Sequence, residues 1–307
     1  ATAGEKISRS AGPVKKRRDG QRTAFILLTV APSLVLFIVF VIFPVINMFY
    51  TSLFTWDGIG EKLFVKFDNY QVLFHSDDFW TAFKNTVFLI FTVTIFTIVL
   101  ALFFAAVLSK GKTKGKTFFR IVFYIPNILS IVVISAIFSA LLAPSYGVIG
   151  AIANLFDKSY TGWLGDTDAV MWCIAFAMVW QAVGYYMVMY MASMSSVPAS
   201  LYESANLDGA GRLTQFFQIT IPLIWTNIRT TLTFFIISTI NMAFLFVKAM
   251  TSGGPNGASD VALSYMYSQK DAGLYGYSMA IGVVIFLFSF ALSACVNKVT
   301  NRDTLEF

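Results

Sequence analysis

The side chains of this 307-residue chain that could do acid–base, nucleophilic or metal chemistry are few and scattered. His75 is the single histidine, and no group of histidine, cysteine and acidic residues has the spacing of metal ligands. Cys173 and Cys295 both lie in apolar runs, where cysteine behaves as a small buried hydrophobe. No nucleophile is paired with a base in a recognisable pattern. The sequence therefore predicts no catalytic residue and no metal site.

The residues with informative types and spacing lie in a polar stretch, Ser195–Trp225, between two apolar runs. Glu203-Ser204-Ala205 is followed after three residues by Gly209, and after nine more by Ile219-Thr220-Ile221-Pro222. A break is expected around Gly209, because glycine readily adopts positive φ. Proline fixes φ and has no N–H, so Pro222 should bend the chain before it returns to apolar sequence. The stretch is predicted to form a helix, a hinge and a second helix outside the bilayer.

This stretch resembles a known motif. The pattern E-A-A, three residues, G, nine residues, I-x-L-P is typical of the cytoplasmic loop of permease subunits in binding-protein-dependent ABC importers, and the chain matches it with Ser204 and Ile221 as mild replacements. The flanks Trp180–Tyr190, Leu201-Tyr202 and Leu207-Asp208-Gly209-Ala210 resemble the sugar-permease branch, specifically the maltose-type first permease subunit. The resemblance covers nearly all of the chain from about Phe25 onward.

The resemblance implies that this stretch couples the chain to a separate ATPase subunit. The two short helices would sit in a groove on that subunit, and Glu203 would pair with a basic group there. From the residues alone a second interpretation stays open, since Ser200-x-x-Glu203 also fits a helix capping box. The residues to which the resemblance assigns the coupling role are Glu203, Ser204, Ala205, Asp208, Gly209, Ile219 and Pro222.

The composition is that of a membrane protein. Hydrophobic residues make up 57% of the chain and charged residues 12%, whereas soluble globular proteins are about a quarter charged. Uncharged runs of about 20 residues are long enough to cross a bilayer as helices. We expect an all-α integral membrane protein with six transmembrane helices, and the resemblance implies the permease fold of type I ABC importers. The expected spans are about 25–43, 86–108, 121–142, 169–194, 230–247 and 277–296.

The distribution of Lys and Arg predicts the orientation of these spans. With the N-terminus inside, 16 of the 22 Lys and Arg residues fall on the same side as both ends of the chain and the Ser195–Trp225 stretch. Basic residues concentrate in cytoplasmic loops. Both termini and the coupling stretch are therefore expected to be cytoplasmic, in a prokaryotic cell membrane.

The expected organisation is a basic cytoplasmic tail (1–24), a permease domain (25–297) with a coupling loop (195–225), and a cytoplasmic C-terminal tail (298–307). Gly111-Lys112-Thr113-Lys114-Gly115-Lys116-Thr117 differs from a phosphate-binding loop, which needs four residues between its glycines and a preceding strand. We interpret it as a cationic cytoplasmic loop. The chain is thus expected to bind no cofactor and not to hydrolyse ATP itself.

Polar side chains inside the expected spans are candidates for a substrate path. Gln181 and Tyr185 share a helix face with Met178, and Asn241 lies in the middle of the fifth span. Such groups either bond between helices or line a wet cavity. An aromatic face beside an amide suits a sugar. By the resemblance, Tyr185 falls at a sugar-contacting tyrosine, whereas Met178 and Ala182 differ from that subunit. Ordinary interhelical packing is the alternative for each residue.

The segments expected outside the membrane are short and rich in aromatic residues, with Trp56-Asp57-Gly58 in the first of them. The third contains Gly253-Gly254-Pro255, which resembles a loop that faces the external binding protein. A plain reverse turn is an equally good interpretation of that sequence.

These observations favour one permease subunit of an ATP-driven importer for an oligosaccharide or glycoside. The resemblance implies three kinds of protein partner: a second similar permease, two ATPase subunits that bind ATP-Mg and an external sugar-binding protein. The composition adds membrane lipid, and no nucleic acid partner is expected because the basic residues form no patch interleaved with aromatic residues. A permease of this class for a non-sugar solute is the nearest alternative. An ion-coupled carrier is a weaker one, because all six runs lack Asp, Glu, Lys, Arg and His and no internal repeat is visible.

Overall fold

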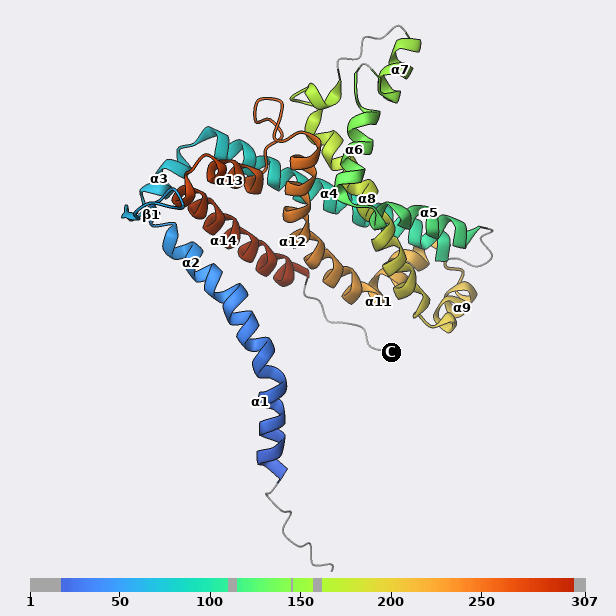
Figure 1. The fold of residues 1–307 in the computed structure, drawn as a ribbon. Helices are drawn as coiled ribbons and strands as arrows, with labels where there is room; N and C mark the ends of the chain where they lie inside the picture. Colours follow the sequence, from blue (N-terminus) through green and yellow to red (C-terminus); the bar gives the residue numbers. More distant parts are fainter. Residues whose placement is uncertain (1–17, 110–114, 145, 157–161, 301–307) are drawn as a thin grey trace, which may run out of the picture. The chain divides into compact units, whose positions relative to one another are not determined.

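A computed structural model describes residues 18–109, 115–144, 146–156 and 162–300 of the chain. The chain divides into two compact units, residues 1–50 and 51–307. The described part of the first unit is helical and contains α1 (Arg18–Phe37), the π-helical turn η1 (Ile38–Ile42) and most of α2 (Phe43–Thr51) (Figure 1). The apolar window that makes it a candidate span has no buried residue.

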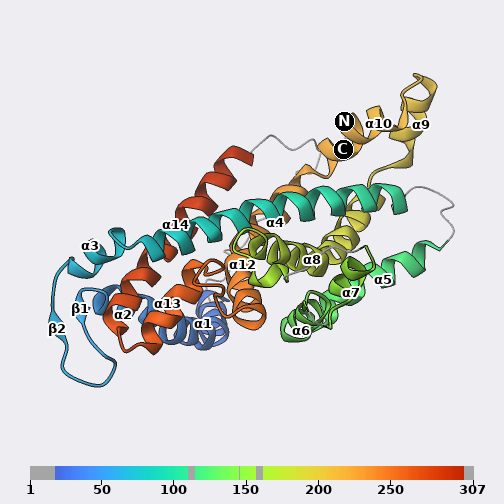
Figure 2. The ribbon, with the colours of Figure 1, turned by 90° about the horizontal axis from the view of Figure 1, so that it is seen from above.

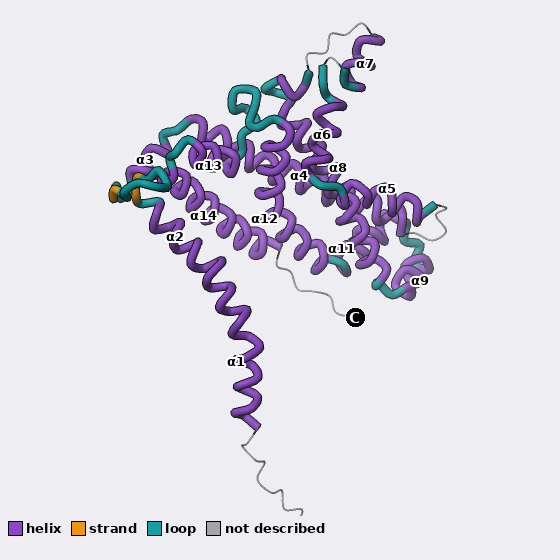
Figure 3. Tube along the Cα trace, viewed as in Figure 1, coloured by secondary structure: helices purple, strands orange, loops and turns teal. Residues whose placement is uncertain are grey.

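Among the described residues of the second unit, the regular structure is helical apart from one small ribbon (Figure 3). Strands β1 (Phe54–Thr55) and β2 (Leu63–Phe64) pair antiparallel, with Phe54 opposite Phe64. The helical elements that follow are α3 (Asp68–Phe74), α4 (Asp77–Ser109), α5 (Lys116–Ile128), α6 (Ile131–Leu141), α7 (Val148–Leu155), η2 (Trp163–Gly165), α8 (Val170–Ser195), α9 (Ala199–Leu207), α10 (Arg212–Gln215), η3 (Phe216–Thr220), α11 (Ile221–Leu223), α12 (Trp225–Met250), α13 (Ala262–Asp271) and α14 (Tyr275–Thr300).

Helix α8 forms the centre of this unit and packs against α4, α5 and α12 (Figure 2). Helix α5 can approach α8 closely because residue 184 of α8 is a glycine. A Cβ at Gly184 would overlap the backbone carbonyl of Phe123 in α5. Between α8 and α12, the buried hydroxyl groups of Tyr190 and Thr231 lie 2.7 Å apart and satisfy each other. Polar groups at this depth are costly unless they find such partners. The core is therefore a tightly packed bundle with a hydrogen bond between two of its helices.

Five helical segments are long and apolar enough to cross a membrane, and a sixth candidate is a bent pair. The five are Thr23–Thr51, α4, α8, α12 and α14. The expectation of one continuous span over 121–142 is wrong, because α5 and α6 meet at an angle of 100°. Leu129 and Ser130 both adopt extended backbone, with ψ of 145° and 140°. Pro126 also removes a hydrogen-bond donor from the last turn of α5.

The two ends of the second unit carry different elements. The β1–β2 ribbon, α3 and α13 lie together at one end, where a second cluster of buried residues includes Leu73, Phe79 and Tyr265. The short helices α9 and α10 lie at the opposite end (Figure 2). Helix α4 extends between these ends (Figure 2). It therefore connects the end that carries the ribbon, α3 and α13 with the end that carries α9 and α10.

Candidate functional site

The expected helix, hinge and second helix are present between α8 and α12. Helix α9 ends in a Schellman motif, in which Gly209 N–H donates to Asn206 O at 3.1 Å and Ala210 N–H donates to Ala205 O at 2.8 Å. Gly209 has φ of +76°, the left-handed value that this motif requires and that favours glycine. The motif glycine and the motif alanine Ala205 thus have linked structural roles: together they end α9 and turn the chain.

A buried glutamine holds the two halves of this stretch together. The Gln215 side chain is 8% exposed, and its Nε2 donates to Asn206 Oδ1 at 2.7 Å and to Ala210 O at 3.0 Å. A second link joins the hydroxyl groups of Tyr202 and Thr220 at 2.9 Å. Gln215 could not be recognised from the sequence, because nothing in the linear sequence shows whether Gln215 or Gln218 points inward. We call the whole assembly, residues 199–223, the paired helices.

The outer surface of the paired helices carries both charged and large apolar side chains. Glu203 is exposed and makes no hydrogen bond or ion pair within the described residues. The capping-box interpretation of Glu203 is wrong, because Pro198 is the N-cap residue of α9 and no side chain caps this helix. Ser204 and Asp208 are also exposed. Leu207, Leu213 and Phe217 are 90%, 74% and 64% exposed.

The remaining motif residues shape the exit from the paired helices. Ile219 lies half-buried in the π-helical turn η3, and Pro222 occupies the first turn of α11. In a helix, a proline ring clashes with the carbonyl four residues earlier. The wider π-helical turn η3 ends two residues before Pro222. The chain then breaks at Ile224, whose ψ of 8° separates α11 from α12. The expected bend is therefore present and has two parts, a π turn before Pro222 and a break after it.

The four substrate candidates are not brought together. Met178 is fully buried, and Gln181 is 8% exposed with its Oε1 unpaired among the described residues. Tyr185 is 39% exposed and packs edge-on against Tyr186, with ring centroids 5.2 Å apart. Asn241 is exposed on α12. Within this chain, Met178 and Gln181 thus belong to the packed interior, and Tyr185 and Asn241 to its surface.

The Gly253-Gly254-Pro255 segment belongs to a tightly built loop between α12 and α13. The Asn85 side chain on α4 donates to the carbonyls of Ala258 and Asp260 at 2.8 and 2.9 Å. Gly253 has φ of +91° and lies directly against the Asp260 carboxylate, so no side chain fits there. Burial raises the pKa of Asp260, and a hydrogen bond from Ser264 partly offsets this increase. The loop is more than a plain reverse turn.

Other chemistry finds no support in the described residues. No group of three or more His, Cys, Asp or Glu side chains there could hold a metal ion. Most of the segment that superficially resembles a phosphate-binding loop, 110–114, lies outside the described residues.

Comparison with known proteins settles the class of the chain. Residues 97–303 match the family described as "Binding-protein-dependent transport system inner membrane component". The chain belongs to this family. It is therefore an inner-membrane, multi-pass permease component of an ABC transporter and not the ATPase.

Individual relatives match this permease over most of its length. It is 34% identical to a probable ABC transporter permease protein, YurN of Bacillus subtilis, over 87% of this chain and 92% of that protein. It is 31% identical to a diacetylchitobiose uptake system permease protein, NgcF of Streptomyces coelicolor, over 98% of this chain and 88% of that protein. A sulfoquinovosyl glycerol transport system permease protein, SmoG of Agrobacterium fabrum, is 30% identical over 92% of this chain and 91% of that protein.

The fold of this permease is also known from solved structures. A chain of a bacterial ABC transporter involved in the import of the acidic polysaccharide alginate superposes with a TM-score of 0.83, over 94% of this chain and 99% of that chain. The sequence identity is 22%, so this likeness concerns the fold. The chain thus has the fold of a chain of a solved ABC importer.

Proposed function

We propose that this permease moves an oligosaccharide or related glycoside inward by alternating access. The observation that carries the proposal is the similarity along the whole chain to the diacetylchitobiose uptake permease, supported by the sulfoquinovosyl glycerol relative. Both of those proteins are named for solutes that contain a sugar. A phosphorylated polyol is the second candidate, because a sn-glycerol-3-phosphate permease is 30% identical over 85% of the chain.

The paired helices are the proposed site of coupling to an ATPase subunit. Their exposed leucine and phenylalanine side chains would be costly to leave in water, and a groove on a partner would cover them. Glu203 lies exposed on the same segment and is available to a basic group of that partner. Because α9 and the π turn are hydrogen-bonded to each other, movement of the ATPase would be passed to α8 and α12 as a rigid-body displacement.

The proposed assembly follows the family's dependence on a binding protein. It contains this permease, a second similar permease, two ATPase subunits that bind ATP-Mg and an external sugar-binding protein. With six spans, counting α5 and α6 as one, both termini and the paired helices would lie in the prokaryotic cytoplasm, and the basic loops support this orientation. The loop at Gly253-Gly254-Pro255 then faces the binding protein.

The substrate would pass between the two permeases. Tyr185 and Asn241 are exposed on the surface of this chain and can reach a cavity that the second permease completes. A tyrosine ring can stack on the C–H face of a sugar, and an amide can hydrogen-bond its hydroxyl groups. Gln181 and Met178 would join that cavity only after the bundle rearranges.

The test is uptake by right-side-out or reconstituted vesicles that contain the complete transporter. Labelled diacetylchitobiose should enter only with ATP and a binding protein, and unlabelled glycosides should compete, whereas sn-glycerol-3-phosphate should not. Competition by sn-glycerol-3-phosphate alone would contradict the sugar proposal. Uptake by this chain alone, driven by an ion gradient without ATP, would contradict the importer mechanism itself.

A further inference from the structure

A pocket of about 420 Å³ lies at the end of the second unit opposite the paired helices. It is bounded by the β1–β2 ribbon, α3, α13 and the start of α14, and none of the residues assigned above to coupling or to the substrate lines it. Its volume falls within the range of small-molecule sites, about 300–1,000 Å³. With the paired helices in the cytoplasm, this pocket opens on the outer side of the membrane.

The walls of the pocket combine aromatic rings with neutral and acidic hydrogen-bonding groups. Trp56 and the tyrosines Tyr265 and Tyr277 supply ring surface. Asn69 and Gln269 supply side-chain amides. Rings can stack on the C–H faces of a pyranose, while amides can both donate to and accept from its hydroxyl groups.

The pocket is held in shape before any ligand arrives. The Trp56 indole N–H donates to Gly60 O at 2.9 Å, and the Trp56 carbonyl accepts from the backbone N–H of Gly276 at 3.1 Å. The Asn69 side chain donates to Ser52 O and Phe54 O at 2.8 and 3.0 Å, which fixes the first strand against α3. Little conformational entropy is therefore lost when a ligand binds.

Two lining side chains keep hydrogen-bonding capacity unused. The Gln269 amide makes no hydrogen bond within the described part of the chain. Asp57 Oδ1 accepts the backbone N–H groups of Ile59 and Gly60 at 2.9 and 2.7 Å, and these bonds lower the pKa of Asp57. Oδ2 of this ionised carboxylate has no described partner, so it can accept a hydrogen bond from a hydroxyl group.

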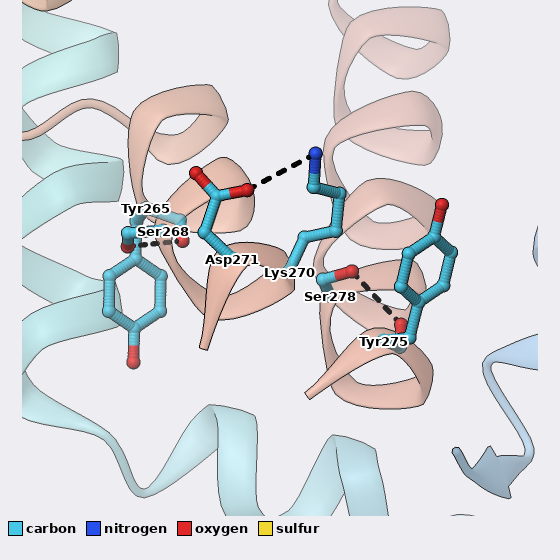
Figure 4. A network of polar contacts seen from close by, with 6 residues as sticks. All are labelled: Tyr265, Ser268, Lys270, Asp271, Tyr275 and Ser278. Carbon is cyan, nitrogen blue, oxygen red and sulfur yellow. Dashed lines mark hydrogen bonds and ion pairs between the residues drawn. The ribbon is translucent and has the colours of Figure 1, made fainter. Parts of the chain in front are cut away.

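The nearest described cations are already engaged. Lys62 lies over the Trp56 ring, 4.2 Å from its centroid. Figure 4 shows Lys270 paired with Asp271 at the end of α13, and the ion-pair distance is 3.2 Å. Figure 4 also shows α14 beginning beside this pair, at Tyr275. A pocket with a carboxylate and without a free ammonium group favours a neutral ligand over an anionic one.

We propose that this pocket is a second saccharide-binding site, which takes one or two neutral sugar units at the outer face of the permease. The proposal rests on the proposed function, since the sugar held there would be the transported solute or one of its units. Trp56 provides the stacking surface, Gln269 and Asp57 bind hydroxyl groups, and Asn69 holds the wall. The site lies apart from Tyr185 and Asn241 and would bind solute before it reaches the transport path.

The experiment measures saccharide binding to the complete transporter in nanodiscs without its binding protein, by saturation-transfer NMR. Diacetylchitobiose and maltose serve as probes, with sn-glycerol-3-phosphate as an anionic comparison. We expect millimolar binding of a neutral saccharide. Gln269→Ala should weaken it about fivefold, as expected for one hydrogen bond, and Asp57→Asn should also weaken it. The matched control is Gln71→Ala, an exposed glutamine on α3 that does not line the pocket.

Two results would overturn the saccharide site and leave the proposed function intact. One is the absence of saccharide binding in a transporter that still takes up sugar with ATP and a binding protein. The other is an unchanged saccharide affinity in Gln269→Ala together with weaker affinity for the binding protein, which would make the pocket a protein contact. Failure of the proposed function looks different: saccharide would bind at this site, with the expected loss in Gln269→Ala, and none would be taken up.

Discussion

The side-chain amide of Gln215 donates to Asn206 Oδ1 at 2.7 Å and thereby joins the two short helices across the turn at Gly209. The same amide nitrogen donates to the carbonyl of Ala210, inside the turn itself. One buried side chain therefore fixes the angle between the two elements that we propose to contact the ATPase. Neither element is long enough to be stable as an isolated helix.

Replacement of Gln215 by alanine should impair coupling. It leaves the carbonyl of Ala210 and the Asn206 side chain without their partner, at a cost of about 1–3 kcal/mol to the local structure. We expect ATP-dependent uptake to fall severalfold at an unchanged level of permease in the membrane. Gln218→Ala is the matched control, because Gln218 is exposed on the same segment. Equal uptake by the two variants would show that this hydrogen bond does not matter for coupling.

Substitutions at Gly209 separate backbone strain from crowding. Nothing lies within 4 Å of a Cβ at this position, so Gly209→Ala meets only the penalty of φ +76°, about 1–2 kcal/mol. Gly209→Pro cannot adopt this φ and loses the N–H that bonds Asn206, so uptake should be abolished. Gly211, with φ of −69° and equally open surroundings, is the control, and Gly211→Ala should transport normally. Normal transport by Gly209→Pro would refute the coupling assignment.

Replacement of Glu203 tests the contact with the ATPase. Because this side chain has no partner within the described chain, Glu203→Gln should leave insertion and folding intact. If it pairs with a basic group of the ATPase, loss of the charge removes about 1.5–3 kcal/mol and weakens association about tenfold or more. The measurement is co-purification of the ATPase with the permease. Glu61→Gln, an exposed glutamate outside the paired helices, should have no effect; a similar loss in both variants would point to a nonspecific charge effect.

Much of this site could be predicted from the sequence, because its determinants are local. The hinge depends on one glycine in a left-handed conformation, and the bend depends on one proline. The hydrogen bond between Gln215 and Asn206 could not be predicted, because it depends on which face of a four-residue helix turns inward. The π turn over 216–220 also could not be predicted, and the directions in which its side chains point depend on it. Within this turn Phe217 is exposed and Phe216 packs against the core.

The helices themselves were predictable from apolar runs, with one instructive exception. The run 121–142 is uncharged and mostly apolar, and hydropathy alone shows no difference between one straight helix and two bent ones. The bend arises at Leu129 and Ser130, where extended backbone follows the turn that contains Pro126. The proline was visible in the sequence, but proline is tolerated in membrane helices when neighbouring groups satisfy the backbone. In the structure α5 packs against α8, and α6 packs against α12 and α8, which hydropathy cannot show.

The pH dependence of the loop between α12 and α13 should follow Asp260. Its pKa lies above the ordinary value of 3.8, chiefly because of burial, and Asp78 raises it further, whereas Ser264 and Lys248 lower it. The folded loop therefore binds a proton more tightly than the unfolded loop, so its stability is greatest at low pH and falls as pH rises from about 3.8 through the raised pKa. Hydrogen exchange of residues 251–261 should slow on acidification, after correction for intrinsic rates. The effect should vanish in Asp260→Asn; an unchanged pH dependence there would assign it to another group.

Tyr185 and Met178, about two helical turns apart on α8, should respond to substitution in opposite ways. Tyr185 is 39% exposed, so Tyr185→Ala removes little packing and should change which glycosides compete for uptake, with ATPase association retained. Met178 is fully buried, so Met178→Ala should cost about 2–5 kcal/mol of stability through the cavity it leaves. The measurements are competition profiles in vesicles and thermal stability of the purified complex. Because a purely structural role for Tyr185 predicts lost stability with an unchanged competition profile, these two readouts together decide whether this tyrosine contacts the solute.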